Sequence, residues 1–275
     1  MPSNIRRSLF LRYKSARQSL RPPPESRTVA FIVGCQRSGT TFLSQLFEKD
    51  MQSKTYGEAG KTSGGNPTSR LRLKPLDEID REIARSSAAL IVLKPLVESQ
   101  NVPELLAHFD NSKAIWLYRH YRDVAASNIA KFGERNSIKD LRPFIERDAT
   151  NWRWEKASEE TRGIIAEHFD EDMSPADAAV LFWIARNRLF FELQLERDAR
   201  VHLCKYERLT SDVDEVARGI YAFLGQSYPG DHITRGTHTQ SIDRGRHLDI
   251  SPAVEARAQR LLDELDAAAD RTAAT

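Results

Sequence analysis

The stretch GCQRSGTT, residues 34–41, combines residue types that bind phosphate. Gly34 and Gly39 occupy the two glycine positions of the phosphate-binding loop pattern G-x-x-x-x-G-K-[ST]. The lysine of that pattern is missing, because Thr40 follows Gly39, and the nearest cation is Arg37 inside the loop. Three hydroxyl groups add possible donors, those of Ser38, Thr40 and Thr41. The stretch is therefore either a chance pair of glycines or an anion-binding loop built for a different ligand, and the missing lysine weakens the interpretation as a kinase or ATPase.

The elements around this stretch predict how the loop is held. TVAFIVG, residues 28–34, is a short apolar run rich in β-branched residues, which is typical of a buried strand. TTFLSQLFEKD, which follows, has apolar residues at helical spacing. A loop between a strand and a helix binds anions because backbone N–H groups converge there and the helix dipole adds about half a positive charge.

The rest of the chain predicts an α/β fold. Further strands are expected at 89–95, 113–119 and 200–206. Helices are expected at 102–109, 123–133, 211–225 and 251–269, and in most of the block 139–198, where Ser174 can cap a helix that starts at Pro175. Strands separated by helices predict a P-loop-type three-layer sandwich with a central parallel sheet flanked by helices.

One domain, residues 28–275, is expected after a basic N-terminal arm, residues 1–27. The arm has a single acid, Glu25, among seven Lys and Arg residues, so it is either a solvated, loosely docked segment or an amphipathic helix that contacts a membrane surface. No apolar run reaches the roughly 18 residues of a membrane span.

The charge and cysteine content exclude several other classes. Net charge is only +2, because 41 cations face 39 anions, and by itself it forces no conclusion about nucleic acid. No nucleic acid is expected as a partner. Cys35 and Cys204 are far apart and lack metal-ligand spacing. They favour reduced thiols in a cytoplasmic setting, with no disulfide framework. Oligomeric state has no signal in the sequence.

Three motifs together resemble a known family. GCQRSGTTFLSQLF is similar to the 5′-phosphosulfate loop, G-x-x-[RK]-S-G-T-T, of sulfotransferases that use 3′-phosphoadenosine 5′-phosphosulfate (PAPS). IWLYRHYRDVAASNIAKF places Arg119 at a strand end and Ser127 eight residues later, as in the family's site for the 3′-phosphate. LCKYERLTSDVDEVARGIYAFLG resembles the family's Tyr-Glu segment and Phe-Leu-Gly helix end, with Tyr206 against the nucleotide. In order and properly spaced, these motifs span residues 30–225.

The resemblance implies PAPS as the donor, 3′-phosphoadenosine 5′-phosphate (PAP) as its product, and no metal. The residues implied in donor binding are Arg37, Ser38, Gly39, Thr40, Thr41, Arg119, Ser127, Tyr206 and, in a looser match, Arg246 or its neighbour Arg244. Lys131, one turn after Ser127, can add charge. A Trp183–Asn187 pair four residues apart resembles a family pair near the nucleotide.

Transfer to a hydroxyl needs a base and cations. Arg37 and Lys94, at the end of the strand ALIVLKP, are expected to stabilise charge on the departing phosphate. Glu58, in SKTYGEAGKTSGG, resembles the base of the tyrosylprotein enzymes, and His108 and His120 are its rivals. The acceptor is a hydroxyl of a carbohydrate, lipid, small molecule or peptide, and the block 139–198, with Trp152 and Trp154, is expected to build its side of the site.

Two other functions stay open on the sequence. A P-loop kinase of a nucleotide or small molecule would need a lysine after Gly39 and a metal-holding aspartate at a strand end. A non-catalytic nucleotide-binding protein would keep the loop alone, and substitutions at Glu58 and Lys94 would separate it from an enzyme.

Overall fold

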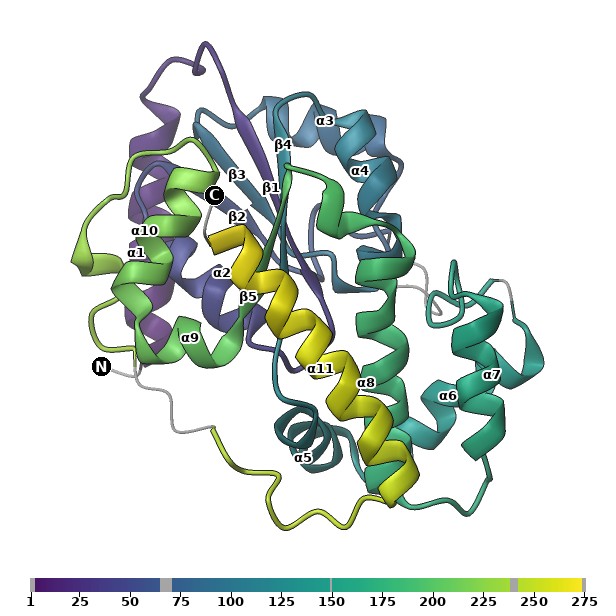
Figure 1. Cartoon of the computed structure of the whole chain (residues 1–275). Helices are drawn as coiled ribbons and strands as arrows, with labels where there is room; N and C mark the ends of the chain where they lie inside the picture. Colours follow the sequence, from purple (N-terminus) through teal and green to yellow (C-terminus); the bar gives the residue numbers. More distant parts are fainter. Residues whose placement is uncertain (1–2, 65–70, 149, 238–241, 274–275) are drawn as a thin grey trace.

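The computed structural model describes residues 3–64, 71–148, 150–237 and 242–273. A five-stranded sheet forms its centre, with strand order β2-β3-β1-β4-β5 and every pair parallel (Figure 1). The strands are β1 (Thr28–Gly34), β2 (Ser53–Tyr56), β3 (Leu90–Leu93), β4 (Ser112–Tyr118) and β5 (Val201–Lys205). The predicted parallel α/β sandwich is therefore confirmed.

The strand residues alternate between two apolar cores, because successive side chains of a strand point to opposite faces. On one face Ala30 and Ile32 pack with α2 (Thr40–Lys49), α9 (Tyr206–Ser211) and α10 (Val213–Phe223). The other face, with Phe31 and Val33, is the larger core. Both faces are covered, which explains why β1 reads as a continuous apolar run.

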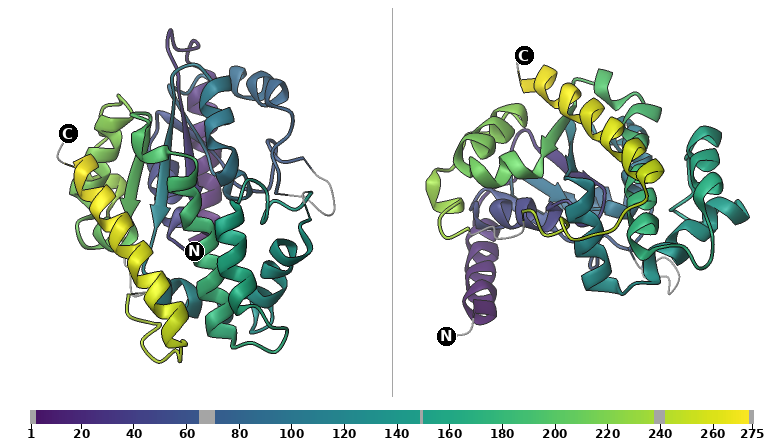
Figure 2. Two further views of the ribbon diagram at one scale, coloured as in Figure 1. Left: turned by 45° about the vertical axis from the view of Figure 1, so that its right-hand side comes forward. Right: turned by 60° about the horizontal axis from the view of Figure 1, so that its bottom comes forward.

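Most of the larger core is covered by helices that Figures 1 and 2 show on the opposite side of the sheet from α2 and α10. They are α3 (Leu76–Ala84), α4 (Val102–His108), α5 (Tyr121–Phe132), α6 (Asn136–Glu146), α8 (Pro175–Glu192) and α11 (Pro252–Ala273). Ser174 caps α8 as predicted, since its side chain accepts from the N–H groups of Ala176 and Asp177. α7 (Glu159–His168) packs on the outer side of α6 and α8.

Several short elements were absent from the sequence-based prediction. They are β2, α3, α9 and the 3₁₀ turns η1 (Leu96–Asn101), η2 (Leu195–Arg197) and η3 (Asp231–Ile233). β2 follows α2 after three residues and carries the chain to Glu58. The two cysteines, Cys35 and Cys204, are free and buried.

The N-terminal arm forms helix α1 (Ser3–Ser19), whose far end projects beyond the body of the molecule (Figure 2, right). Its second half is attached by buried polar groups. Lys14 Nζ donates to the carbonyls of Phe47 (3.3 Å) and Glu48 (2.8 Å), and Gln18 Nε2 donates to that of Ser53 (2.7 Å). α1 is thus held more firmly than a solvated arm.

The first half of α1 is attached as well, because Arg7 pairs with Glu48 on α2 (2.6 Å). The exposed apolar side chains of the helix are Ile5, Leu9 and Tyr13. Among the described residues, no helix combines the length and the apolar character that crossing a membrane requires.

Candidate active site

The loop between β1 and α2 holds a buried polar group that nothing satisfies. Ser38 is fully buried, and its Oγ has no hydrogen-bond partner. Gly34 has φ 118°, and a Cβ there would lie 2.2 Å from the carbonyl oxygen of Leu117 on β4. Gly39 precedes α2 without a side-chain cap, and Gly39, Thr40 and Thr41 line a cavity. The loop therefore offers hydroxyl and backbone N–H donors to an anion.

Arg37, Ser127 and Arg119 come together on one side of this cavity. Arg37 Nε donates to Ser127 Oγ (2.9 Å), and Arg119 Nη1 lies 3.5 Å from the carbonyl oxygen of Arg37. Within the described part of the chain, Arg37 forms no ion pair, and its partial burial, followed by repulsion from Arg119, lowers its pKa. Two cations that face one cavity in this way fit an anionic ligand.

Arg119 is fixed from behind by two groups outside the cavity. Its Nη2 lies 3.0 Å from Asp123 Oδ2, four residues later on α5, in a pair that is almost fully buried. Its carbonyl accepts from Trp183 Nε1 on α8 (2.9 Å). Trp183 and Asn187 do not line the cavity, and Asn187 donates to the Trp183 carbonyl. Trp183 thus positions Arg119, and Asn187 binds the carbonyl of Trp183. Both lie behind the residues that line the cavity.

Tyr206, the first residue after β5, packs against both Arg119 and the loop between β1 and α2. The Arg119 guanidinium carbon lies 4.6 Å from the centre of its ring. A Cβ on Gly39 would lie 2.1 Å from Tyr206 Cδ2, so the loop approaches the ring as closely as it does only because residue 39 is glycine. The loop, Arg119 and Tyr206 form one packed unit.

Glu58 and Lys94 meet at the other side of the loop. Lys94 Nζ lies 2.6 Å from Glu58 Oε1 and donates to Thr41 Oγ1 (3.0 Å). Lys94 follows β3 directly, β3 pairs with β1 as expected, and Glu58 comes two residues after β2. A carboxylate that can accept a proton and an ammonium that can stabilise negative charge therefore touch each other beside the phosphate-binding loop.

The loop 242–248 brings one arginine to the cavity. Asp123 anchors this loop, because its two carboxylate oxygens accept from the backbone N–H groups of Asp243 and Gly245, both at 3.0 Å. Arg244 lines the cavity. Arg246, the residue named in the sequence-based prediction, is exposed, pairs with Asp243 (2.6 Å) and does not line it. Lys131 is also exposed and outside the cavity lining.

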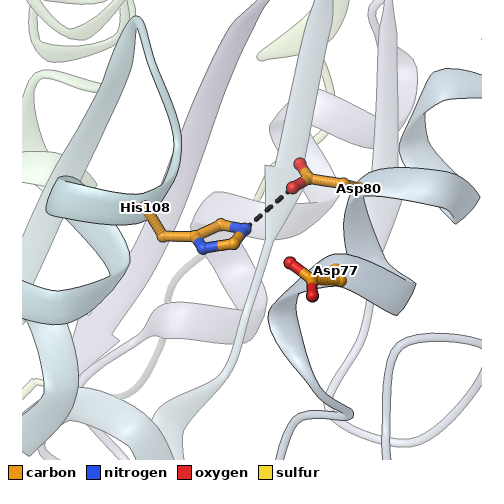
Figure 3. Close-up of side chains that lie close together, drawn as sticks. All are labelled: Asp77, Asp80 and His108. Carbon is orange, nitrogen blue, oxygen red and sulfur yellow. Dashed lines mark hydrogen bonds and ion pairs between the residues drawn. The ribbon is translucent and has the colours of Figure 1, made fainter.

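Neither rival histidine lines the cavity. His108, on α4, points to α3, where its Nε2 lies 2.8 Å from Asp80 Oδ2 with Asp77 nearby (Figure 3). His120 caps α5, since its Nδ1 accepts from the N–H of Arg122, and burial lowers its pKa. Both rings have structural partners, whereas Glu58 lines the cavity.

The cavity has a volume of about 610 Å³ and extends from the loop to α6 and α8. Its far wall carries apolar side chains and three further arginines, and of these residues the sequence singled out only Trp152. These residues are Leu71, Arg72, Leu96, Val97, Phe132, Trp152, Arg153, Phe182 and Arg186. Trp152, expected on the acceptor side, does line the cavity, whereas Trp154 packs against Phe144 behind it.

The sequence did contain a signal that Arg186, the arginine of this wall on α8, is buried. α8 is apolar on nearly all sides, which is typical of a helix buried all round, so a charged residue within it is expected to be buried too.

A family model described as a sulfotransferase domain matches residues 27–260. The chain belongs to the sulfotransferase domain family. Two solved structures share the fold. The sulfotransferase domain from the curacin biosynthetic pathway has a TM-score of 0.53 and 16% identity, over 88% of this chain and 99% of that one. The sulfotransferase from Alicyclobacillus acidocaldarius has a TM-score of 0.50 and 16% identity, over 90% and 95%. No curated protein sequence matched the chain.

The match covers all five strands of this sulfotransferase and each loop that follows a strand. The family assigns sulfuryl transfer as the general activity. It leaves the donor, the acceptor and the catalytic base to be argued from the residues of the cavity.

Proposed function

We propose that the protein transfers a sulfuryl group from PAPS to an acceptor hydroxyl, with Glu58 as the base and the reacting groups in line. The observation that carries this proposal is the contact of Glu58 with Lys94 (2.6 Å) and of Lys94 with Thr41 (3.0 Å). The cation Lys94 thereby joins a candidate base and a loop hydroxyl, both of which line the cavity.

The residues around the loop fit the donor. The unsatisfied Ser38 Oγ and the hydroxyls of Thr40 and Thr41 suit its 5′ end, together with Arg37. Arg119 and Ser127 suit its 3′-phosphate, and Tyr206 its nucleotide ring. In the loop 242–248, Arg244 suits this role better than Arg246, because only Arg244 lines the cavity. PAPS supplies an SO₃ group whose transfer develops less charge than phosphoryl transfer, so fixed cations can serve where kinases use Mg²⁺.

Each residue of the pair has a defined task. Glu58 accepts the proton of the acceptor hydroxyl, and Lys94 stabilises negative charge on the departing phosphate oxygen. A positioned base of this kind typically contributes about 10²- to 10⁴-fold to the rate. Arg37 adds a second cation at the same end of the cavity.

The structure gives the two alternatives less support. A kinase would need a lysine where Thr40 stands and a metal-binding aspartate at a strand end. Asp123, five residues after the end of β4, is already engaged by Arg119 and two backbone N–H groups. A non-catalytic binding protein has no use for a Glu58–Lys94 pair beside the loop.

Donor binding is tested by thermal shift with PAP and, separately, with ATP and Mg²⁺. A ligand at about 100 times its dissociation constant stabilises the fold by about 2.7 kcal/mol. We expect PAP to raise the melting temperature of the wild type, and Arg119→Ala to abolish that rise relative to its own unliganded state. A rise with ATP alone would favour the kinase.

Catalysis is tested by PAP release from PAPS with a panel of phenols, sugars, hydroxylated lipids and tyrosine peptides. We expect Glu58→Gln to lower turnover about 10²- to 10⁴-fold while the thermal shift with PAP persists. Lys94→Ala should lower turnover as well. Glu171→Gln is the control, because Glu171 pairs with Arg142 (2.7 Å) away from the cavity. Unchanged turnover in both cavity variants would contradict the assignment.

A further inference from the structure

Arg186, on α8, is a buried cation in the wall of the cavity. It is 2% exposed, and it lines the cavity from the side of Trp152 and Phe182. Its Nη2 donates to Gln100 Oε1 (3.1 Å), but its Nη1 is buried and has no hydrogen-bond partner. Among the residues that the structure describes, no carboxylate lies within ion-pair distance of Arg186.

The other two arginines of this wall are neutralised. Arg72 lies 2.7 Å from Glu98 and 2.6 Å from Glu155, and Arg153 lies 2.7 Å from Asp140. Glu155 also accepts from Gln100 Nε2 (2.8 Å), so Gln100 stands between Arg186 and the nearest acid of this network. Arg186 therefore differs from both neighbours in having only a neutral amide as a partner.

A buried charge without a counter-ion is costly, so its persistence needs a reason. Burial lowers the pKa of Arg186 to about 10, which still leaves it charged near neutral pH. The Trp152 ring, 5.0 Å from the guanidinium carbon, attracts the cation without neutralising it. The missing negative charge is supplied if an anionic ligand enters the cavity that Arg186 lines.

We propose that Arg186 binds an acidic group of the acceptor, so that the substrates are hydroxylated anions with a carboxylate or a phosphate. This inference rests on the proposed function, in which the hydroxyl lies at Glu58. The donor already has Arg37, Arg119 and Ser127 at the other part of the cavity. Around Arg186 the lining is apolar, with Leu96, Trp152 and Phe182, which suits a hydrocarbon segment between the acid and the hydroxyl.

The test compares matched acceptors on the full chain with PAPS. ω-Hydroxyalkanoates are compared with alkan-1-ols of equal length, and ω-hydroxyalkyl phosphates form a third series. We expect the wild type to favour an acid over the matching alcohol in kcat/KM by about 10- to 150-fold, the ratio that one charge-assisted hydrogen bond provides. Whichever acid is preferred identifies the group that Arg186 binds.

Arg186→Met keeps a long apolar side chain on Trp152 and removes the charge. We expect it to reduce the preference to within about threefold, by losing the acids and leaving the alcohols nearly unchanged. Arg188→Met is the matched control. Arg188 lies two residues away on the same helix and binds Glu160, Glu192 and Thr161 outside the cavity, so its loss should leave the preference intact.

Binding without turnover separates this inference from the proposed function. Each acid is added to the PAP complex, and the further thermal shift is recorded for the wild type and Arg186→Met. An acid-specific shift that depends on Arg186, without any turnover, supports the acceptor site and contradicts the proposed function. Turnover without a preference for acids supports the proposed function and contradicts the acceptor site for an acid.

Three results would overturn the inference: equal use of acids and alcohols by the wild type, equal loss of both series in Arg186→Met, or loss of the PAP shift in that variant. The last would make Arg186 a donor residue. If Arg186→Met does not fold, the wild-type comparison and Arg186→Lys, which keeps the charge, decide the matter.

Discussion

At the scale of a single residue, Gly39 determines how closely the loop approaches Tyr206 in the proposed donor site. Its φ of 90° and the position of the Tyr206 ring leave no room for a side chain, and Arg119 stacks on the same ring. The glycine was predicted from the loop pattern. Its contact with Tyr206 was not, because the two residues are 167 positions apart in the sequence.

We expect Gly39→Ala to lower the free energy of unfolding by roughly 1–3 kcal/mol and to weaken PAP binding, because Tyr206 must move and Arg119 with it. Gly219→Ala is the control. No atom lies within 4 Å of a Cβ at Gly219 on α10, so alanine should raise stability by up to about 1 kcal/mol. Urea unfolding measures the stability of both variants, and titration with PAP measures their binding. A Gly39→Ala variant with the stability and PAP affinity of the wild type would show that the Tyr206 ring moves aside without cost.

The choice between Arg244 and Arg246 shows where single-residue prediction from the sequence ends. Both lie in a loop without periodicity, so the sequence could place them only in the same segment. The structure separates them through Asp123, which accepts from the N–H groups of residues 243 and 245 and so turns residue 244 toward the cavity lining.

Helix α1 is the element whose attachment has a measurable signature. Lys14 Nζ binds the last carbonyls of α2, at the negative end of that helix's dipole. Burial is the largest influence on Lys14 and lowers its pKa to about 8. In the unfolded chain a lysine has a pKa of about 10.4.

The native state therefore releases the Lys14 proton at a lower pH than the unfolded state. Between about pH 8 and pH 10 the unfolded state binds more protons, so stability rises with pH. We expect the free energy of unfolding of the wild type, relative to Lys14→Met, to increase by roughly 1–3 kcal/mol over this range. Guanidinium unfolding of both proteins at several pH values measures it. A difference that does not change with pH would mean that Lys14 is solvated.

At the same scale, long apolar elements were predicted and short polar ones were not. β1, β4 and α8 each contain an unbroken apolar run of five residues or more. β2, with the sequence SKTY, is a four-residue edge strand, and its two central residues are only partly buried. Such a segment forms a strand because β3 offers a partner, which is information that lies outside its own sequence.

For the whole molecule, the parallel sheet explains why the proposed site residues meet. Each of the five strands is followed at its carboxyl end by a residue of the proposed site: the loop after β1, then Glu58, Lys94, Arg119 and Tyr206. Lys94 joins this site through Glu58 and Thr41, which line the cavity. Parallel sheets gather ligands at this edge. The sequence could thus bring together the residues of the proposed donor site, since strand ends can be recognised. The far wall depends on how α6 and α8 pack, which no local pattern records.

The position of Trp152 has a further, optical consequence. The chain has four tryptophans, and Trp116 and Trp183 are sealed in the core. Trp152 faces the cavity with the guanidinium carbons of Arg153 and Arg186 at 4.7 and 5.0 Å from its ring. Because the emission of an indole responds to nearby charge, a ligand that neutralises this wall should shift the intrinsic fluorescence of the protein. Trp152→Phe should remove that shift. The intrinsic fluorescence of Trp152 would then report acceptor binding directly, without an added label and before any product has formed.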